Sequence, residues 1–592
     1  MQKARRLTII LQAMATLPPI IFALVYIRVV SIETTLSLVG VGVIAALFGY
    51  NLYRFSQSKR LIYYPLLPVL VLSFLIYGIY QLGSKDTPQS FEAMNFPQHK
   101  AALFTLPKVS YIDKVCYYSG IDKNAKFKLH YAQNGKWKTF YEHKERFPYS
   151  FTWKCFDAKV STHQLYFDLI SAKIQLGEVR LFDKNQNPIA YKSNLKLLND
   201  EPHALFDQSY YSGTVFDEIY HPRTAYEILH ELPVYENTHP YLGKIIIGWG
   251  IKAFGMNPFG WRIMNLLFAS LLIIVIYYFA NALFAKRTFA FFGALLMTYS
   301  FMHLTQGRIG LIDTFGVLFI LTSYYLLYIF ISKQKLRWLM LSGVFFGLAS
   351  AIKWSAVFAS LGFVAIALYL LFTRYPLQKR FGGLKLLLYG IASYGVLAVG
   401  VYALSFYEIY LQTGSLDKII EYQVNMFNYH SAVKGSHPYA SAWWSWIIDY
   451  RPMCYKREDT PAFFSSITAF GNPAIFWMGL VSIIYLYTKR CQHTLNSTFI
   501  FFAFIALFLP YAFIGREMFI YHFYYAIPFL MLAILYFLRD MIKRFDLVRR
   551  YFLLYFTLVW GLFLLYYPVL TGYRVSKEYV DNVLRWFPGW WF

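Results

Sequence analysis

The stretch FDEIYHPRTAYEILHELPVYENTHPYLGKIIIGWG, residues 216–250, joins a polar segment to an apolar one. Two adjacent carboxylates, Asp217 and Glu218, stand near its start, and a His-Pro pair and Lys244 come directly before the oily run. Ionisable groups at membrane depth cost about 2.5 to 3.5 kcal/mol each on insertion scales, so they tend to face a cavity or a partner. The stretch therefore predicts a functional loop at the edge of a membrane.

The rest of the chain is mostly apolar. Of its 592 residues, 57% are hydrophobic and only 15% are charged, and apolar runs of membrane-spanning length recur from end to end. This composition predicts a polytopic α-helical membrane protein among membrane lipids. The formal net charge of +25 comes from short Lys and Arg clusters between the apolar runs. Cytoplasmic loops show this pattern, so nucleic-acid binding is not expected.

The apolar runs predict about thirteen transmembrane helices. Three come early, at 8–28, 36–54 and 61–83, and ten follow at 263–284, 288–302, 309–332, 338–353, 355–373, 386–407, 474–488, 496–513, 519–538 and 551–570. The start MQKARR is short and basic, and the first run has no small-residue cleavage site, so an uncleaved cytoplasmic N-terminus is expected.

The basic connections test this topology. Clusters such as AKR (285–287), SKQKLR (332–337), TKR (488–490) and RDMIKRFDLVRR (539–550) fall at every second connection. Cytoplasmic loops carry this excess of Lys and Arg. The alternation predicts a protein of the plasma membrane with residues 88–262 and the C-terminus on the extracytoplasmic side.

Residues 88–205 have a different character, with short strand-like runs and polar turns. FKLHYAQNGKWKTFYEH alternates around Asn134-Gly135, which is a strong hairpin signal. We expect an inserted extracytoplasmic β-sandwich or jelly-roll domain here. It divides the chain into helices in 1–87, the β domain in 88–205, and a helical part in 206–592 that begins with an outer loop at 206–262.

The four cysteines show neither CxxC spacing nor neighbouring histidines, which argues against a zinc site. Cys116 and Cys155 both lie in the predicted outer domain. In an oxidising compartment they could form a disulfide, and two buried free thiols are the alternative.

The predicted topology gathers polar residues from distant segments at the outer face. They are Asp217, Glu218, His239, Lys244, Arg262, Arg308, Asp313, Lys353, His437, Arg451, Arg516 and His522. One shared extracytoplasmic site is the economical explanation, although interfacial anchors and interhelical pairs remain alternatives for some of them. Arg308 and Asp313 are five residues apart, which points their side chains about 140° apart on a helix. Each is therefore expected to have another partner.

The residue types suggest a chemistry. Adjacent carboxylates cannot both aim at one atom, so one of Asp217 and Glu218 could act as general base while the other orients a neighbour. A general base suits a poorly acidic nucleophile such as a Ser or Thr hydroxyl. A departing phosphate needs positive charge, which the forks of Arg262, Arg308 or Arg516 could supply.

The absence of nucleotide-binding motifs limits the kind of sugar donor that the protein could use. The chain has no GxxxxGK[ST], no GxGxxG opening a helix and no DxD pair, which argues against nucleotide chemistry. A donor that partitions into the bilayer fits better. Asp217, Glu218 and His221 could in principle hold a divalent ion, but arginine can neutralise a monophosphate, so we expect no metal and no cofactor.

Several of these segments are similar to one family. FDEIYHPRTAYEIL and HPYLGKIIIGWGIKAFGMNPFGWRIMNLLF, then GRIGLIDTF, GLASAIKWSAVF, YHSAVKGSHPYASAWWSW, FGNPAIFW and REMFIYHFYYAIPF, resemble in this order the protein O-mannosyltransferases. These are phospholipid-carrier-dependent glycosyltransferases of the GT-C fold. The resemblance covers about residue 211 to the C-terminus. It implies an inverting enzyme that moves mannose from a polyprenyl-phosphate carrier to Ser or Thr of secreted proteins.

The resemblance also implies roles for residues. The acidic pair Asp217 and Glu218 is expected to be catalytic, with Asp217 as base and Glu218 as its orienting neighbour. Arg262 is expected to serve the donor phosphate. Arg308, Lys353 and Arg516 are weaker candidates for donor binding. Support of the substrate site could come from His239, Lys244, Asp313, His437, Trp443 and His522.

Two departures limit the resemblance. The loop at 408–470 is too short for the MIR domain of eukaryotic members, so the chain resembles a bacterial type, and it adds two early spans and the β domain. GEVRLFD in that domain loosely resembles carbohydrate-binding jelly rolls. The domain could bind glycan or acceptor, or only brace the outer loop.

Two alternatives stay open. The acceptor could be a cell-wall polymer or a glycolipid, because nothing in the sequence fixes the acceptor hydroxyl. A transporter or lipid flippase is less favoured, because no internal repeat is found.

Overall fold

The computed structural model describes residues 66–592 apart from 144–149, 374–375, 433–434, 436 and 491–493. The helices predicted at 8–28 and 36–54, the N-terminus and Cys491 lie outside the described residues. The chain divides into two compact units, each described here by itself. We call them the helical unit (Met1–Tyr80, Glu236–Ile245 and Asn265–Phe592) and the β unit (Gln81–Tyr235 and Ile246–Met264).

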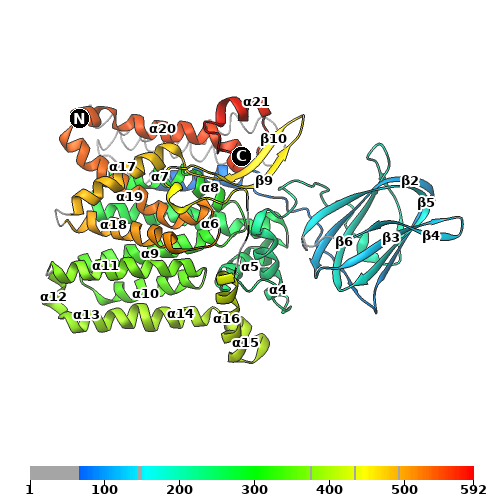
Figure 1. The fold of residues 1–592 in the computed structure, drawn as a ribbon, viewed down its shortest axis with the longest axis horizontal. Coiled ribbons are helices and arrows are strands. Elements are labelled where there is room, and N and C mark those ends of the chain that lie inside the picture. Colours follow the sequence, from blue (N-terminus) through cyan, green and yellow to red (C-terminus); the bar gives the residue numbers. More distant parts are fainter. Residues whose placement is uncertain (1–65, 144–149, 374–375, 433–434, 436, 491–493) are drawn as a thin grey trace, which may run out of the picture. The chain divides into compact units, whose positions relative to one another are not determined.

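The β unit contains one eight-stranded antiparallel sheet (Figure 1). Its strands are β1 (Glu92–Asn95), β2 (Ala101–Asp122), β3 (Lys126–Gln133), β4 (Lys136–Glu142), β5 (Thr152–Ser171), β6 (Lys173–Phe182), β7 (Pro188–Ile189) and β8 (Lys192–Ser193). The main order is β1-β6-β2-β5-β3-β4, with β7 on β6 and β8 on β2. The long strands β2 and β5 link the others by hydrogen bonds. The predicted two-sheet sandwich is therefore not confirmed.

The β3–β4 hairpin turns where the sequence predicted. Lys136 pairs with Gln133, and the two residues between them, Asn134 and Gly135, have φ angles of 52° and 74°. A two-residue type I′ turn needs positive φ at both positions, which Asn and Gly tolerate. The dipeptide therefore fixes the register of this hairpin.

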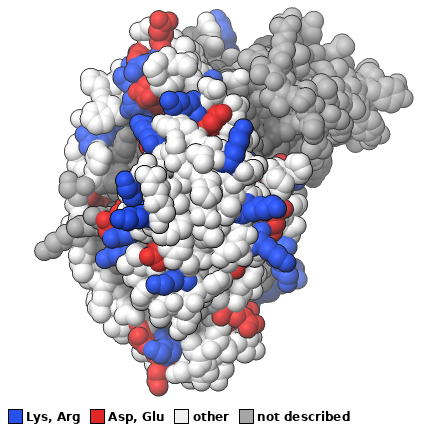
Figure 2. Space-filling view, turned by 90° about the vertical axis from the view of Figure 1, so that its right-hand side faces the viewer, with Lys and Arg blue, Asp and Glu red and all other residues white. Residues whose placement is uncertain are grey.

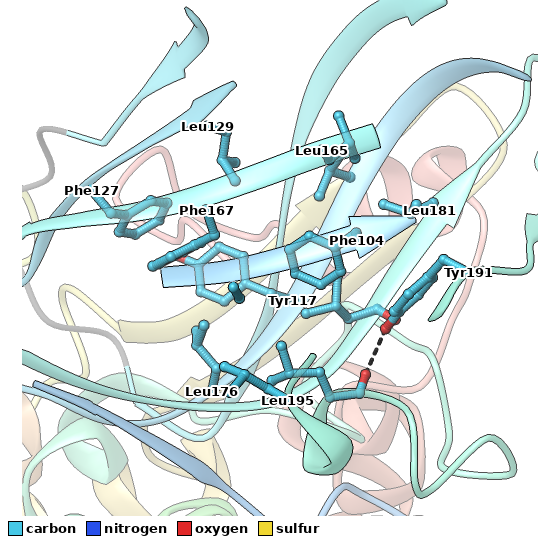
Figure 3. Packing of buried hydrophobic residues seen from close by; sticks show 14 of the residues in the cluster. Phe104, Tyr117, Phe127, Leu129, Leu165, Phe167, Leu176, Leu181, Tyr191 and Leu195 are labelled. Carbon is cyan, nitrogen blue, oxygen red and sulfur yellow. Dashed lines mark hydrogen bonds between the residues drawn. The ribbon is translucent and has the colours of Figure 1, made fainter. Parts of the chain in front are cut away.

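The buried face of the sheet forms a hydrophobic core of its own (Figure 3). Phe127 stacks on Phe167 with ring centroids 4.5 Å apart, and Tyr117 meets Phe127 edge-on at 5.7 Å. These rings come from β3, β5 and β2, so the core joins strands that are distant in sequence. Cys116 and Cys155 pair across β2 and β5 and form a disulfide. The β unit also contains η2 (Phe216–Ile219) and α4 (His221–Leu229).

The helical unit is a bundle in which α17, α18 and α19 pack on one another and α9 packs on α10 (Figure 1). Helices α5 (Leu242–Phe254) and α6 (Pro258–Phe284) run through the points where the chain passes between units. The remaining helices are α3 (Leu66–Ile79), α7 (Arg287–Thr298), α8 (Phe301–Gly307), α9 (Asp313–Lys333), α10 (Leu336–Ser350), η3 (Trp354–Phe358), α11 (Ala359–Phe372), α12 (Pro376–Phe381), α13 (Gly383–Gly390), η4 (Ile391–Leu397), α14 (Ala398–Leu404), α15 (Tyr407–Thr413), α16 (Leu416–Ala432), η5 (Trp443–Ser445), α17 (Pro473–Arg490), α18 (Leu495–Phe508), η6 (Leu509–Phe513), η7 (Ile520–Ala526), α19 (Ile527–Arg544), α20 (Asp546–Thr571), α21 (Lys577–Tyr579) and η8 (Val580–Leu584).

The protein is a multi-pass membrane protein. Within the described residues, seven helical segments are long and apolar enough to cross a membrane, or eight if the bent pair α7–α8 is one span. Shorter apolar helices lie at Leu66–Ile79, Leu336–Ser350 and Pro473–Thr488. Nine of the ten later predicted spans overlap a helix or a continuous helical segment, and the span predicted at 288–302 falls on the bent pair α7–α8. The total of thirteen stays a prediction.

The charged side chains do not gather in one patch on the face shown in Figure 2. Lys and Arg are interspersed there with Asp and Glu among uncharged residues. Nucleic-acid binding proteins carry a basic patch or stripe. The pattern on this face therefore gives no support to nucleic-acid binding.

Candidate active site

The acidic loop of the β unit is one turn of 3-10 helix, η2, directly before α4. Phe216, at its start, has a φ of 50°, in the left-handed region that non-glycine residues rarely adopt. The Val215 N–H donates to Glu218 Oε2 at 2.8 Å, and the Glu218 N–H donates to the Val215 carbonyl at 3.0 Å. This reciprocal pair closes the turn and holds Asp217 between its ends.

Arg262 anchors this loop from α6. Its Nε donates to Glu218 Oε1 at 2.7 Å and its Nη2 to Glu218 Oε2 at 2.6 Å, which is a bidentate ion pair. Its Nη1 donates to the carbonyls of Leu82 and Tyr210, and Nη2 also to that of Gly213, all at 2.9 Å. A guanidinium has five N–H donors, so all of them are used. Arg262 has no donor left for a phosphate, which argues against its predicted role.

The two carboxylates of the loop therefore differ. Glu218 is fully buried and paired with Arg262, whereas Asp217 is only half-buried. Both oxygens of Glu218 already accept hydrogen bonds from Arg262, and Oε2 also accepts the Val215 N–H. This arrangement suits Asp217 to proton transfer and Glu218 to holding the loop. This division of roles agrees with the one expected from the sequence and stays a prediction.

In the helical unit, the segment before α5 forms a second charged cluster. The Lys244 Nζ is buried, forms an ion pair with Glu236, and donates to the carbonyls of Glu236 at 2.9 Å and His239 at 3.0 Å. Glu236 Oε1 accepts from the Thr238 N–H at 2.7 Å and lies 3.4 Å from His239 Nδ1. The predicted residues Lys244 and His239 thus meet at Glu236, which the sequence did not single out.

His430 on α16 connects this segment to Arg516. Its Nε2 lies 2.7 Å from the Thr238 carbonyl, so Nε2 carries the proton. Its Nδ1 is then an acceptor, and it receives the Arg516 Nη1 at 3.2 Å. Burial and the charge of Arg516 lower the pKa of His430. The ring is therefore neutral at neutral pH and positions the arginine.

Three more of the predicted ionisable residues also have partners in the helical unit. Lys353 Nζ bonds Asp313 Oδ1 at 2.9 Å, at the start of α9. Arg308 Nη1 donates to the carbonyls of Tyr77 at 3.3 Å, Gly78, and Tyr80 at 2.7 Å, and so caps the C-terminal end of α3. The prediction that Arg308 and Asp313 have separate partners is confirmed, but the carbonyl contacts of Arg308 speak against phosphate binding.

Aromatic rings surround His522. It stacks on Tyr521 with centroids 4.5 Å apart and on Trp446 at 6.0 Å. Trp446 is fully buried, whereas the predicted Trp443 meets Phe508 edge-on. Trp446, which stacks on His522, was not singled out from the sequence, and the role expected of Trp443 stays a prediction.

The exposed loop after α16 holds the remaining predicted residues. His437 donates its backbone N–H to Glu517 Oε1 at 3.1 Å and faces Phe519 edge-on. Arg451 Nη1 donates to the carbonyls of Pro438 at 3.3 Å and Ala440 at 3.2 Å. These contacts shape the loop.

The helical unit also contains an apolar cavity of about 600 Å³. It runs beside α11 from Ser360 to Leu371 and is lined otherwise by α9, α10, α13 and η4. Lys353 stands directly before η3 and α11. Apolar walls of this kind suit a hydrocarbon chain.

Among the described residues, no three His, Cys, Asp or Glu side chains come together in a group that could hold a metal ion. The acidic loop and its Arg262 anchor belong to the β unit. The clusters around Glu236, Asp313, His430 and His522 belong to the helical unit.

Comparison with known proteins gives consistent matches. The family model for dolichyl-phosphate-mannose-protein mannosyltransferase matches residues 197–416, and the model for the C-terminal four TMM region of protein-O-mannosyltransferase matches residues 415–590. Together they cover most of the chain.

Two curated relatives are polyprenol-phosphate-mannose–protein mannosyltransferases. The Corynebacterium glutamicum protein is 26% identical over 422 residues, which are 60% of this chain and 81% of the relative. The Mycolicibacterium smegmatis protein is 24% identical over 455 residues, which are 64% of this chain and 88% of the relative.

A solved structure shares the fold. The Saccharomyces cerevisiae protein O-mannosyltransferase Pmt1–Pmt2 complex bound to the sugar donor matches with a TM-score of 0.57 at 12% identity. The match covers 64% of this chain and 89% of that chain. At this identity the likeness concerns the fold alone.

Proposed function

Because the chain belongs to the protein O-mannosyltransferase family, we propose that it transfers mannose from a polyprenyl-phosphate-mannose donor to Ser or Thr hydroxyls of secreted proteins on the extracytoplasmic face of the plasma membrane. The observation that carries this proposal is the acidic loop, in which a buried arginine fork holds Glu218 and leaves the half-buried Asp217 as the second carboxylate.

Asp217 is the proposed general base. It takes the proton of the acceptor hydroxyl as the hydroxyl oxygen attacks C1 of mannose. A new C1–O bond forms to the acceptor, and the bond from C1 to the phosphate oxygen breaks with inversion. The electron pair of that bond leaves with the polyprenyl phosphate. Glu218 and Arg262 position the loop and do not touch the reacting atoms.

Arg516 is the proposed ligand of the leaving phosphate. Arg262 uses all its N–H groups on protein acceptors, and Arg308 caps α3. Arg516 is half-buried, and its bond to His430 is its one hydrogen bond within the described part of the chain. Its remaining N–H groups can bind phosphate oxygens and stabilise the charge that develops on them. The cavity along α11 is the proposed place of the polyprenyl chain.

The test uses purified protein, polyprenyl-phosphomannose and a Ser/Thr peptide. Asp217→Asn should lower turnover by about 10² to 10⁴-fold, the usual worth of a general base. The matched control is Asp157→Asn, which changes an exposed aspartate of the same unit and should leave turnover unchanged. EDTA should leave the wild-type rate unchanged, because no step needs a metal ion.

Three results count against this proposal. Turnover in Asp217→Asn equal to that of the wild type would show that Asp217 is not the general base. If EDTA abolishes activity and a divalent ion restores it, the metal-free mechanism is wrong. Mass spectrometry of secreted proteins from a deletion strain tests the acceptor. Unchanged protein glycosylation with an altered envelope polysaccharide would move it to a polymer.

A further inference from the structure

Arg223, at the start of α4, is a buried arginine with unused donors. It is 1% exposed, and its Nε donates to Glu227 Oε1 at 3.0 Å. The other oxygen of Glu227 accepts the Tyr235 N–H at 2.7 Å. Neither Nη1 nor Nη2 of Arg223 has a hydrogen-bond partner among the described residues. Within the described ranges, the four Nη N–H donors of this charged group are therefore buried without an acceptor.

Arg262 provides an internal comparison. It lies in the same unit and is equally buried, yet all five of its N–H groups bond to protein acceptors. A buried donor without an acceptor destabilises the fold, and a charged donor does so more strongly. Among the residues that the structure describes, all donors of Arg262 have acceptors, whereas only the Nε of Arg223 has one. This difference indicates that the Nη edge of Arg223 is kept for a ligand.

A tyrosine ring lies against the guanidinium of Arg223. The guanidinium carbon of Arg223 lies 3.8 Å from the centroid of Tyr235, and Tyr220 lies nearly parallel to Tyr235 at 6.4 Å. Tyr235 is 42% exposed, so a rotation of this one side chain opens a path from solvent to the guanidinium. The ring also holds the guanidinium in place by cation–π attraction.

We propose that Arg223 binds a carboxylate of the acceptor polypeptide and so makes the enzyme prefer Ser or Thr residues that have an acidic neighbour. The proposal rests on the function proposed above. Two parallel N–H groups of an arginine match the two oxygens of a carboxylate. Arg223 lies six residues after Asp217 on the same short segment, which places the acidic neighbour close to the hydroxyl that reacts. Arg223 is thus a specificity residue and not a catalytic one.

The experiment uses peptides with one Ser and a single Asp at each position from four residues before it to four after it. Each Asp peptide has an Asn twin of the same shape. Full-length wild type, Arg223→Gln and Arg223→Lys are compared by kcat/KM and by equilibrium binding of the labelled peptides. Arg180→Gln is the control, because Arg180 is a partly exposed arginine of the same unit that also lies over aromatic rings.

In wild type we expect a preference of about tenfold or more for the Asp peptide over its Asn twin at one or two positions. Arg223→Gln should lose this preference and keep its activity on the Asn peptides. Arg223→Lys keeps the charge without the fork and should keep part of the preference, and it also serves if Arg223→Gln does not fold. Arg180→Gln should behave like wild type.

Equal use of Asp and Asn peptides by wild type at every position would overturn the proposal. A variant that raises the KM of the donor and leaves the peptide preference intact would overturn it too, because the fork would then serve the phosphate. The binding measurement separates the two proposals. If no mannose is transferred but Asp-peptide binding still depends on Arg223, the carboxylate site stands and the proposed function falls.

Discussion

Glu218 and Arg262 form a buried ion pair, with side chains 0% and 1% exposed. Removing one partner of such a pair leaves an uncompensated buried charge, which costs about 3 to 5 kcal/mol. Glu218→Gln keeps the shape of the side chain, so we expect a loss of this size in the free energy of unfolding of the β unit, measured by thermal or denaturant unfolding. Asp157→Asn is the control in the same unit, because its pair with Lys159 is 64% exposed on both sides and should contribute below about 1 kcal/mol. Equal losses in the two variants would contradict the prediction.

His430 gives a second prediction, on pH. Its pKa lies below the ordinary value of about 6.5 because of burial and the charge of Arg516. At neutral pH the ring is uncharged and accepts from Arg516, whereas acidification below pH 6.5 favours states in which the ring takes a proton. Protonation removes that acceptor and sets two cations side by side.

The KM of the donor should therefore rise in wild type as the pH falls below about 6.5. Gln at position 430 keeps an acceptor oxygen but does not titrate. In His430→Gln the acid limb of the donor KM should be flatter, as measured from pH 5 to 8. The same acid limb in both proteins would show that another group is responsible.

These residues also show which parts of the candidate site could be predicted from the sequence. Lys244, His239 and Arg516 could be predicted because polar residues at the end of an apolar run stand out. His430 could not, because its role comes from a contact with Thr238, 192 residues earlier in the chain. Glu236 was missed although it lies only eight residues before its partner Lys244. Arg262 also stood out as a polar residue beside an apolar run. That all its N–H groups are used on protein acceptors could not be predicted, because these acceptors come together only in the folded loop.

At the scale of elements, we expect opposite effects from substitutions of Arg308 and Arg516: one should lower stability and the other should raise the donor KM. Arg308→Gln removes the donor to the last carbonyls of α3, so we expect a loss of about 1 to 3 kcal/mol in stability and an unchanged donor KM. Arg516→Gln removes a proposed phosphate contact, so we expect a donor KM raised by about tenfold or more and little change in thermal stability. Steady-state kinetics and a melting curve for each variant test these two assignments. A raised donor KM in Arg308→Gln with an unchanged melting temperature would reverse the assignment.

The elements themselves were predictable where their signal is local. Apolar runs gave the ten later helices, and Asn134-Gly135 gave the β3–β4 hairpin. The sandwich was not confirmed, because pairing of β2 with both β5 and β6 joins all strands into one sheet, and such pairing is not local. The 60° bend between α7 and α8 also escaped, because the run 288–302 is apolar throughout.

For the whole molecule, the remaining question is which side of the membrane each segment occupies. Basic clusters fall at alternate connections, which predicts the β unit outside. The Cys116–Cys155 disulfide is an independent argument, because disulfides persist in oxidising compartments and not in the cytosol. Both arguments give the same orientation, and only that orientation lets secreted proteins reach Asp217.

Cysteine labelling checks this orientation. In a background with Cys454 and Cys491 changed to Ser, Lys136→Cys puts a thiol at the exposed start of β4, and Lys335→Cys puts one at the exposed connection between α9 and α10. A membrane-impermeant maleimide should label Lys136→Cys in intact cells and Lys335→Cys only after permeabilisation. The background protein, with its disulfide intact, should not be labelled in either state. Labelling of Lys335→Cys in intact cells, with Lys136→Cys protected, would invert the topology, and the β unit would then lie in the cytosol, away from every secreted acceptor.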